Sequence, residues 1–207
     1  MEEKKKNTGS SIKTIIIAIV LVAIVLFYFN HLSNESSKRR TESEITEIEQ
    51  LSNYNMVDNY PKTPRDVVKL HNRYFKLFYG KTLTDDELVI LNQQVRYLYS
   101  EELLSYNEEN KNLNSLSESI DKMKDDGYVY KLCELPEPSQ IDYYTQNGVE
   151  MASLEVRITL RVTEDDEESM VYSYVQYVLV KENDKWKIQA WGTSQMGQDT
   201  GYQDDQE

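Results

Sequence analysis

The chain has 207 residues, of which 39% are hydrophobic and 29% are charged, and its formal net charge is −13. This length fits one globular domain with appendages, or at most two small domains. Residues 1–40 carry a net charge of +4, so the rest of the chain carries −17, which excludes general nucleic-acid binding because such a body repels phosphate backbones. One cysteine and two histidines exclude a disulfide framework and a histidine-rich metal site, so we expect no metal and no cofactor.

The strongest signal along the chain is an apolar run near the N-terminus. Residues Ile15–Phe29 read IIIAIVLVAIVLFYF and include no charged side chain. Extending the run to residues 12–32 gives a helix of about 30 Å, which spans the hydrocarbon core of a bilayer. The residues after the run are bulky, and this favours an uncleaved signal-anchor over a cleaved signal peptide. We therefore predict that the chain contacts the lipid bilayer through residues 12–32.

The charges that flank this run set its expected orientation. Four lysines precede it, while Lys38, Arg39 and Arg40 follow it, so the positive-inside rule narrowly favours a cytoplasmic N-terminus. We expect a single-pass plasma-membrane protein in which residues 1–11 form a cytoplasmic tail and the C-terminal domain is extracytoplasmic.

Polar segments lie on both sides of the predicted domain. Residues 33–60 are interpreted as a linker or stalk, and Ile45, Ile48 and Leu51 indicate a short helix within it. This helix is either part of a stalk coiled coil or a short solvated helix. We favour the solvated helix, because a coiled coil needs about three or four heptads. Residues 195–207 have no apolar periodicity and several acids, which predicts a disordered acidic tail.

The predicted domain, residues 61–194, begins with helices. The sequence Thr63-Pro64-Arg65-Asp66 supplies an N-cap, a proline at the first helical position and an early acid. An apolar stripe follows, and Gly80 is expected to end this helix. Residues 84–87 form a capping box that opens a second helix. A short helical turn is expected at residues 100–104, and a further helix before Gly127.

After these helices the pattern changes to strands. Residues 128–135 are rich in β-forming side chains. Asn147-Gly148 is the preferred pair for a type I′ hairpin, so residues 142–146 are expected to pair with the strand that follows. That strand alternates apolar and polar side chains from Ala152 to Thr163, which predicts one buried face and one exposed face.

Two further strands complete the domain. An acidic turn at residues 165–168 leads to one strand, and Asn183-Asp184 leads to a last strand in which Trp186, Ile188 and Ala190 are expected to share a face. Helices followed by an antiparallel meander predict an α+β fold. We expect three to four helices packed on one side of a curved antiparallel sheet.

Two resemblances to known families add to this interpretation. The order of elements and the ending YVLVKENDKWKIQAW (Tyr177–Trp191) resemble the nuclear-transport-factor-two superfamily. This resemblance implies a cone of helices and bent sheet, whose open end sometimes forms an enzyme pocket with an Asp or His base and a Tyr donor. The lysine-rich start, the TIIIAIVLV anchor and YPKTPRDVVKLHNRYFKLFYG (Tyr60–Gly80) resemble a family of uncharacterised, N-terminally membrane-anchored proteins of Gram-positive gut anaerobes. That second resemblance implies location and fold, and no activity.

The candidates for an enzyme site at the open end of the cone are His71, Tyr74 and Asp142. A base and a tyrosine can move a proton next to a carbonyl or drive a dehydration, so the enzyme hypothesis is a small-molecule isomerase or dehydratase. The alternative is that His71 packs in the core with its ring nitrogens satisfied and that Asp142 caps a turn. We favour this alternative, because no catalytic dyad is close in the sequence.

Tyrosine usage points instead to a binding surface. The chain has 16 Tyr against 4 Phe and 2 Trp, and tyrosine supplies rigid amphipathic contact area. Tyrosine also suits a half-exposed strand, and both interpretations remain open. We expect a membrane-anchored binding or interaction module for an envelope ligand, whether protein, peptide or glycan. An open cavity at His71 or Asp142 would favour the enzyme, whereas an interior filled by Phe75, Leu91 and Met123 would favour the binding module.

The sheet also offers a surface for self-association. The long strand carries Arg157 and Arg161 on its polar face, and Tyr172, Tyr174 and Gln176 on the next strand are spaced to lie beside them. Arginine and tyrosine are enriched in protein interfaces and can stack on one another. We therefore expect a weak homodimer through these residues, tighter as salt rises because salt screens the negative charge of the domain.

Overall fold

The computed structural model describes residues 42–164 and 167–194. The chain divides into two compact units, Met1–Glu47 and Ile48–Glu207, and most of the described residues belong to the second. Among the described residues, no helix has the length and apolar content to cross a membrane.

Several predictions concern segments outside this range. The cytoplasmic tail (residues 1–11), the membrane segment (residues 12–32) and the acidic tail (residues 195–207) lie outside the described residues. They stay predictions.

The second unit has an α+β fold in which helices precede strands. The helices of the described residues are α2 (Glu42–Ser52), α3 (Pro64–Gly80), α4 (Asp85–Arg96), α5 (Glu101–Tyr106) and α6 (Glu109–Asp125). The strands are β1 (Tyr128–Glu134), β2 (Asp142–Gln146), β3 (Val149–Glu164), β4 (Glu167–Glu182) and β5 (Lys185–Thr193). A short 3₁₀-helix, η1 (Pro138–Gln140), joins β1 to β2.

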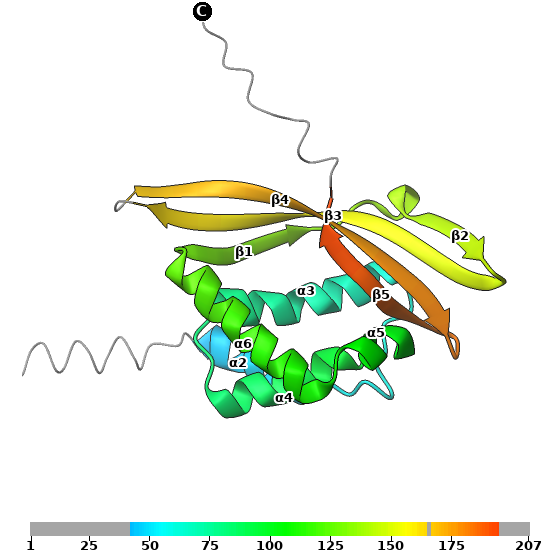
Figure 1. Ribbon diagram of the computed structural model, residues 1–207, viewed down its shortest axis with the longest axis horizontal. Coiled ribbons are helices and arrows are strands. Elements are labelled where there is room, and N and C mark those ends of the chain that lie inside the picture. Colours follow the sequence, from blue (N-terminus) through cyan, green and yellow to red (C-terminus); the bar gives the residue numbers. More distant parts are fainter. Residues whose placement is uncertain (1–41, 165–166, 195–207) are drawn as a thin grey trace, which may run out of the picture. The chain divides into compact units, whose positions relative to one another are not determined.

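The strands form one antiparallel sheet in the order β1-β3-β4-β5, and β2 pairs with the remaining part of the β3 edge. The predicted hairpin turns are present: Asn147, Gly148, Asn183 and Asp184 all have positive φ, as type I′ turns require. Figure 1 shows α3 to α6 on one face of the sheet and no α-helix on the other. We call these the inner and outer faces. The predicted fold class, helices packed on one side of an antiparallel sheet, is confirmed.

Helix α3 lies against the inner face and contacts β1, β3 and β5. Its start matches the prediction: the Asp66 N–H donates to the Thr63 hydroxyl, and Pro64 is the first helical residue. The helix ends at Gly80, as the sequence predicts. A Cβ atom on Gly80 would lie 2.8 Å from the Tyr130 carbonyl oxygen, so glycine lets the end of α3 approach β1 closely.

Helix α2 departs from the prediction of a solvated helix. Ile48 and Leu51 are buried, and Met56 joins them in the hydrophobic core. The Leu51 carbonyl also accepts a hydrogen bond from the Tyr74 hydroxyl at 3.0 Å. The solvated-helix prediction is therefore wrong for Ile48 and Leu51. Apolar residues spaced three apart are too few for a coiled coil but enough to pack onto a neighbouring core, and the compact unit starts at Ile48 instead of residue 61.

Strand β5 departs from the predicted alternation. The β4–β5 register shifts so that Gln189 is the extra residue of a β-bulge between Ile188 and Ala190. A bulge reverses the side-chain alternation beyond it. Ile188 is buried as predicted, but Ala190 is exposed, and Trp191 instead turns toward His71 with ring centroids 5.0 Å apart. The prediction for Ala190 is wrong because periodicity carries no signal for an inserted residue.

Candidate functional site

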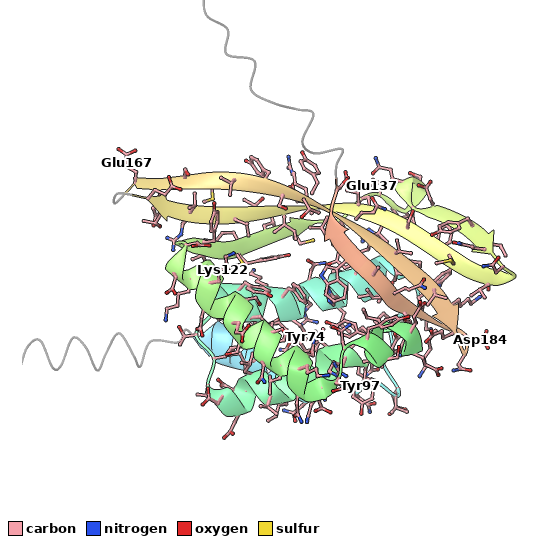
Figure 2. All side chains as sticks on the ribbon, viewed as in Figure 1. Tyr74, Tyr97, Lys122, Glu137, Glu167 and Asp184 are labelled. Atoms are coloured by element: carbon pink, nitrogen blue, oxygen red, sulfur yellow. The ribbon has the colours of Figure 1, made fainter. Side chains whose placement is uncertain are left out.

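The three residues considered for catalysis are not brought together. His71 lies on α3 and its side chain is fully buried. Tyr74 lies on the same helix but donates its hydroxyl to the Leu51 carbonyl, and Figure 2 shows it within the helical layer. Asp142 begins β2 and is exposed.

His71 belongs to a buried hydrogen-bonded network between α3 and the sheet, which we call the His71 network. The Tyr130 hydroxyl donates to Asn72 Oδ1 at 2.7 Å, and Asn72 Nδ2 donates to the Tyr177 hydroxyl at 3.2 Å. The Tyr177 oxygen lies 3.1 Å from His71 Nδ1. The Tyr99 oxygen lies 3.4 Å from His71 Nε2. Both ring nitrogens therefore have partners inside the protein.

The donors of this network assign the tautomer of His71. The Asn72 amide uses its hydrogens on the Val68 carbonyl and the Tyr177 oxygen, so the single Tyr177 proton is left for His71 Nδ1. Nε2 then carries the imidazole proton and directs it toward Tyr99. Burial lowers the pKa of His71 to about 3 and raises the pKa of Tyr177 and Tyr99 above the usual tyrosine value. His71 is neutral at pH 7.

Aromatic rings surround His71, and three of them, Phe75, Tyr99 and Trp191, also line a cavity of about 200 Å³ between α3, α4 and α6. The ring centroid of Phe75 lies 4.2 Å from that of His71, and those of Trp191 and Tyr177 lie 5.0 and 5.5 Å away. Of the other two residues expected to fill the interior, Leu91 is fully buried, whereas Met123 lines a separate cavity of about 170 Å³ between α3 and α6. A general base needs a free lone pair within reach of a substrate, and this site offers none on His71.

The partners of His71 were missed by the sequence reasoning. Asn72 is a polar residue next to an apolar stripe, and Tyr130 and Tyr177 alternate with the side chains of the opposite face of their strands. The sequence pattern could therefore have indicated that these three residues face the core. No sequence pattern indicated the positions of Tyr99 and Trp191, because Tyr99 is positioned by a turn after α4 and Trp191 by the bulge in β5. No group of three or more His, Cys, Asp or Glu within residues 42–164 and 167–194 could hold a metal ion.

The residues predicted for an interface do come together, on the outer face. Arg157 pairs in register with Tyr174, and Thr159 pairs with Tyr172, as the spacing predicts. The Arg157 guanidinium lies 5.1 Å from the centroid of the Tyr172 ring. We define the outer patch as the following residues of β1, β3 and β4: Leu132, Glu134, Arg157, Arg161, Met170, Tyr172, Tyr174 and Gln176.

The outer patch mixes paired charges with exposed apolar area. Arg157 forms an ion pair with Glu134, and the hydrogen bond from Arg157 lowers the pKa of the Glu134 carboxyl, so both groups are ionised at pH 7. Leu132, Met170 and Tyr172 are 51%, 55% and 59% exposed. Because Glu134 pairs with Arg157 and the adjacent Glu168 pairs with Arg161, the patch presents paired charges and exposed apolar area on an acidic protein. Its role as an interface stays a prediction.

The outer patch borders an open sheet edge. Strand β5 pairs with β4 from Val175 onward, and the Ser194 N–H donates to the Tyr174 carbonyl at 2.8 Å. Within the described part of the chain, no strand pairs with this edge from Glu167 to Ser173. Unpaired edge groups can template an added strand, and the glutamates at the start of β4 limit uncontrolled pairing.

Comparison with known proteins gives a family but no activity. The search of curated proteins found no match. Among solved structures, the intermembrane space region of the chloroplast protein ARC6 is 13% identical, covers 64% of this chain and 98% of that chain, and has a TM-score of 0.30. The family model described as "Domain of unknown function (DUF6715)" matches residues 1–191. Because this match covers most of the sequence, the chain belongs to the DUF6715 family.

Proposed function

We propose that this protein is a single-pass, membrane-anchored binding module whose extracytoplasmic domain contacts a protein partner through the outer patch. The observation that carries the proposal is the composition of that patch. Arginine, tyrosine and methionine are the residue types enriched in protein interfaces, and here they gather on a sheet face without a covering α-helix in the described chain. The first partner to test is a second copy of the chain.

The proposed anchor is residues 12–32, with residues 1–11 cytoplasmic. The length of the apolar run and its bulky C-terminal flank support this part of the proposal. Protease added to intact cells or spheroplasts tests it directly. Digestion of the C-terminal domain is expected, whereas survival of that domain beside a digested external control would reverse the orientation.

The two family resemblances described from the sequence are also part of the proposal. The order of helices before an antiparallel meander supports a nuclear-transport-factor-two-like fold, and so does the ending Tyr177–Trp191. The lysine-rich start and the segment Tyr60–Gly80 support an origin among membrane-anchored proteins of Gram-positive gut anaerobes.

An isomerase or dehydratase that uses the cone cavity has less support. Both His71 nitrogens lie near protein hydroxyls, and His71 is fully buried and does not line the cavity beside Phe75 and Trp191. Tyr74 is engaged with the Leu51 carbonyl, and Asp142 is exposed on β2. These positions do not assemble a base and a donor around one substrate.

Site-specific photo-crosslinking in intact cells tests the binding surface. A photo-reactive phenylalanine analogue, p-benzoylphenylalanine, replaces Tyr172 in the outer patch of the full chain. The matched control carries the same group at Tyr106 on α5, which is 78% exposed and outside the patch. We expect a discrete adduct after irradiation from position 172 and none from position 106.

The mass of the adduct identifies the partner class. An adduct of twice the chain mass indicates a homodimer, and a different discrete mass indicates another envelope protein. No adduct from position 172, or the same adducts from both positions, would overturn the proposal for the outer patch.

A further inference from the structure

A cavity of about 490 Å³ lies between α4, α5, the start of α6 and β5. Its volume is within the range of small-molecule sites, roughly 300–1,000 Å³. None of the residues that line it belongs to the outer patch, so it is a separate place on the domain. Figure 2 labels Tyr97, one of its lining residues, beside α5.

Two cations line this cavity in an otherwise acidic domain. They are Arg96, at the end of α4, and Lys187, on β5. Lys187 donates to the Tyr97 carbonyl. The Arg96 Nη1 atom is buried and has no hydrogen-bond partner among the described residues. The positive charges of Arg96 and Lys187 make this side of the cavity favour a ligand that carries an anionic acceptor.

A buried acceptor without a partner lies in another lining side chain. Gln94 donates its Nε2 to the Ser52 carbonyl at 3.1 Å, which leaves the Oε1 atom buried and without a partner in the described part of the chain. The Glu109 carboxylate also lines the cavity and accepts a hydrogen bond from Gln93 at 2.9 Å. The Glu109 carboxylate makes this side of the cavity favour a ligand that carries a cationic donor.

The rest of the lining is apolar. Ile90 and Tyr97 are 43% and 58% exposed, so their side chains are available to a ligand. Leu104 is partly buried and packs against the hydrophobic core. Contact with these three side chains removes apolar area from water, which favours a ligand with an aromatic or large aliphatic body.

We propose that this cavity binds a free α-amino acid with an aromatic or large aliphatic side chain. The carboxylate of the ligand accepts from Arg96, with Lys187 adding positive charge. The ammonium group of the ligand lies toward the Glu109 carboxylate. The side chain of the ligand lies against the apolar lining. A zwitterionic ligand thereby meets both the cations and the carboxylate of the lining, which neither a simple anion nor a simple cation does.

Three probes that differ by one charged group test the proposal on the full chain. L-phenylalanine carries both groups, 3-phenylpropionate lacks the ammonium, and phenethylamine lacks the carboxylate. Binding is followed by ligand-observed saturation-transfer NMR and titrated to a Kd. We expect L-phenylalanine to bind about tenfold more tightly than either analogue, which corresponds to about 1.4 kcal/mol. Equal affinity of L-phenylalanine and an analogue, or no saturable binding of L-phenylalanine, overturns the proposal.

A charge-matched pair of variants tests the role of Arg96. Arg96→Gln is expected to weaken L-phenylalanine about tenfold and to leave phenethylamine unchanged. The control, Lys122→Gln, removes one positive charge from an exposed position that Figure 2 shows at the other end of the helical layer, and it is expected to change neither affinity. Equal weakening by both variants would overturn the assignment. Tyr97→Ala, at the exposed rim, provides a second variant: weaker binding of L-phenylalanine is expected, and unchanged affinity would remove the apolar contact from the proposal.

Discussion

The inner and outer faces of the sheet both carry tyrosines, but the tyrosines of the two faces differ in what they contact. On the inner face, the Tyr130 and Tyr177 hydroxyls take part in the His71 network, and burial raises their pKa. On the outer face, Tyr172 is 59% exposed and lies under the Arg157 guanidinium. A high tyrosine content therefore does not by itself indicate a binding surface. The hydrogen-bond partners of each hydroxyl separate tyrosines that hold the fold from tyrosines that a partner can reach.

Charge follows the same division. His71 of α3, which packs against the inner face, stays neutral because a buried charge without a counter-ion is costly. The outer face carries ion pairs, Arg157 with Glu134 and Arg161 with Glu168, at positions open to water. Exposed pairs of this kind add little to stability, so the outer face is free to vary for recognition. The comparison predicts that substitutions on the two faces separate stability from binding.

The largest expected difference comes from the same truncation on the two faces. Tyr177→Ala removes a side chain that is 1% exposed, and it is expected to lower the free energy of unfolding by about 3–5 kcal/mol. Tyr172→Ala is expected to change it by less than about 1 kcal/mol. Urea unfolding of the full chain, followed by the fluorescence of Trp186 and Trp191, measures both. Equal losses would contradict the division between the faces.

The next effect is a dependence of stability on pH. Burial lowers the pKa of His71 to about 3, whereas an unfolded histidine titrates near 6.5. Between these values the unfolded chain binds more protons than the folded one, so the free energy of unfolding falls as pH falls. From about pH 7 to about pH 5 the loss is about 2 kcal/mol.

The variant His71→Phe isolates the contribution of His71 to this pH dependence of stability. It is expected to be less stable than the wild type at neutral pH, because Tyr177 and Tyr99 lose their partner, but to have a flatter stability profile between about pH 7 and about pH 5. Denaturant melts across this range measure the difference, and parallel profiles for the two proteins would show that His71 is not buried and neutral.

A smaller effect tests single hydroxyl groups. Tyr130→Phe leaves Asn72 Oδ1 buried without the donor at 2.7 Å, and is expected to lower the free energy of unfolding by about 1–2 kcal/mol. Tyr174→Phe, on the outer face, is expected to leave it unchanged within experimental error. Thermal unfolding of the pair measures the contrast. A neutral Tyr130→Phe would mean that the network does not stabilise the core.

The smallest expected effect on stability is on the outer patch. Arg157→Gln breaks the exposed pair with Glu134 and the contact with Tyr172, and no measurable change in the unfolding midpoint is expected. The yield of the adduct from the photo-reactive group at position 172 is expected to fall. A large loss of stability with an unchanged adduct would assign Arg157 to the fold instead of the interface.

Much of the fold was predictable because its signals are local. The cap at Thr63, the capping box at Thr84 and the Asn147-Gly148 turn each depend on a few neighbouring residues, and all are present. Strict alternation along β3 also predicted which side chains share the outer face, so Arg157 beside Tyr174 was predictable from spacing alone. Alternation failed at Gln189, where one inserted residue turned Trp191 toward His71.

The sequence by itself thus determined the element order, the fold class and which side chains of β3 and β4 share the outer patch, since backbone preferences and side-chain periodicity act over a few residues. Only the tertiary structure decided what surrounds His71, because its partners Tyr99 and Tyr177 lie 28 and 106 residues away along the chain. It also decided that Leu51 belongs to the core and that Arg96 and Lys187 line one cavity. These contacts depend on how the helices pack against a bulged sheet, and packing is a property of the whole domain.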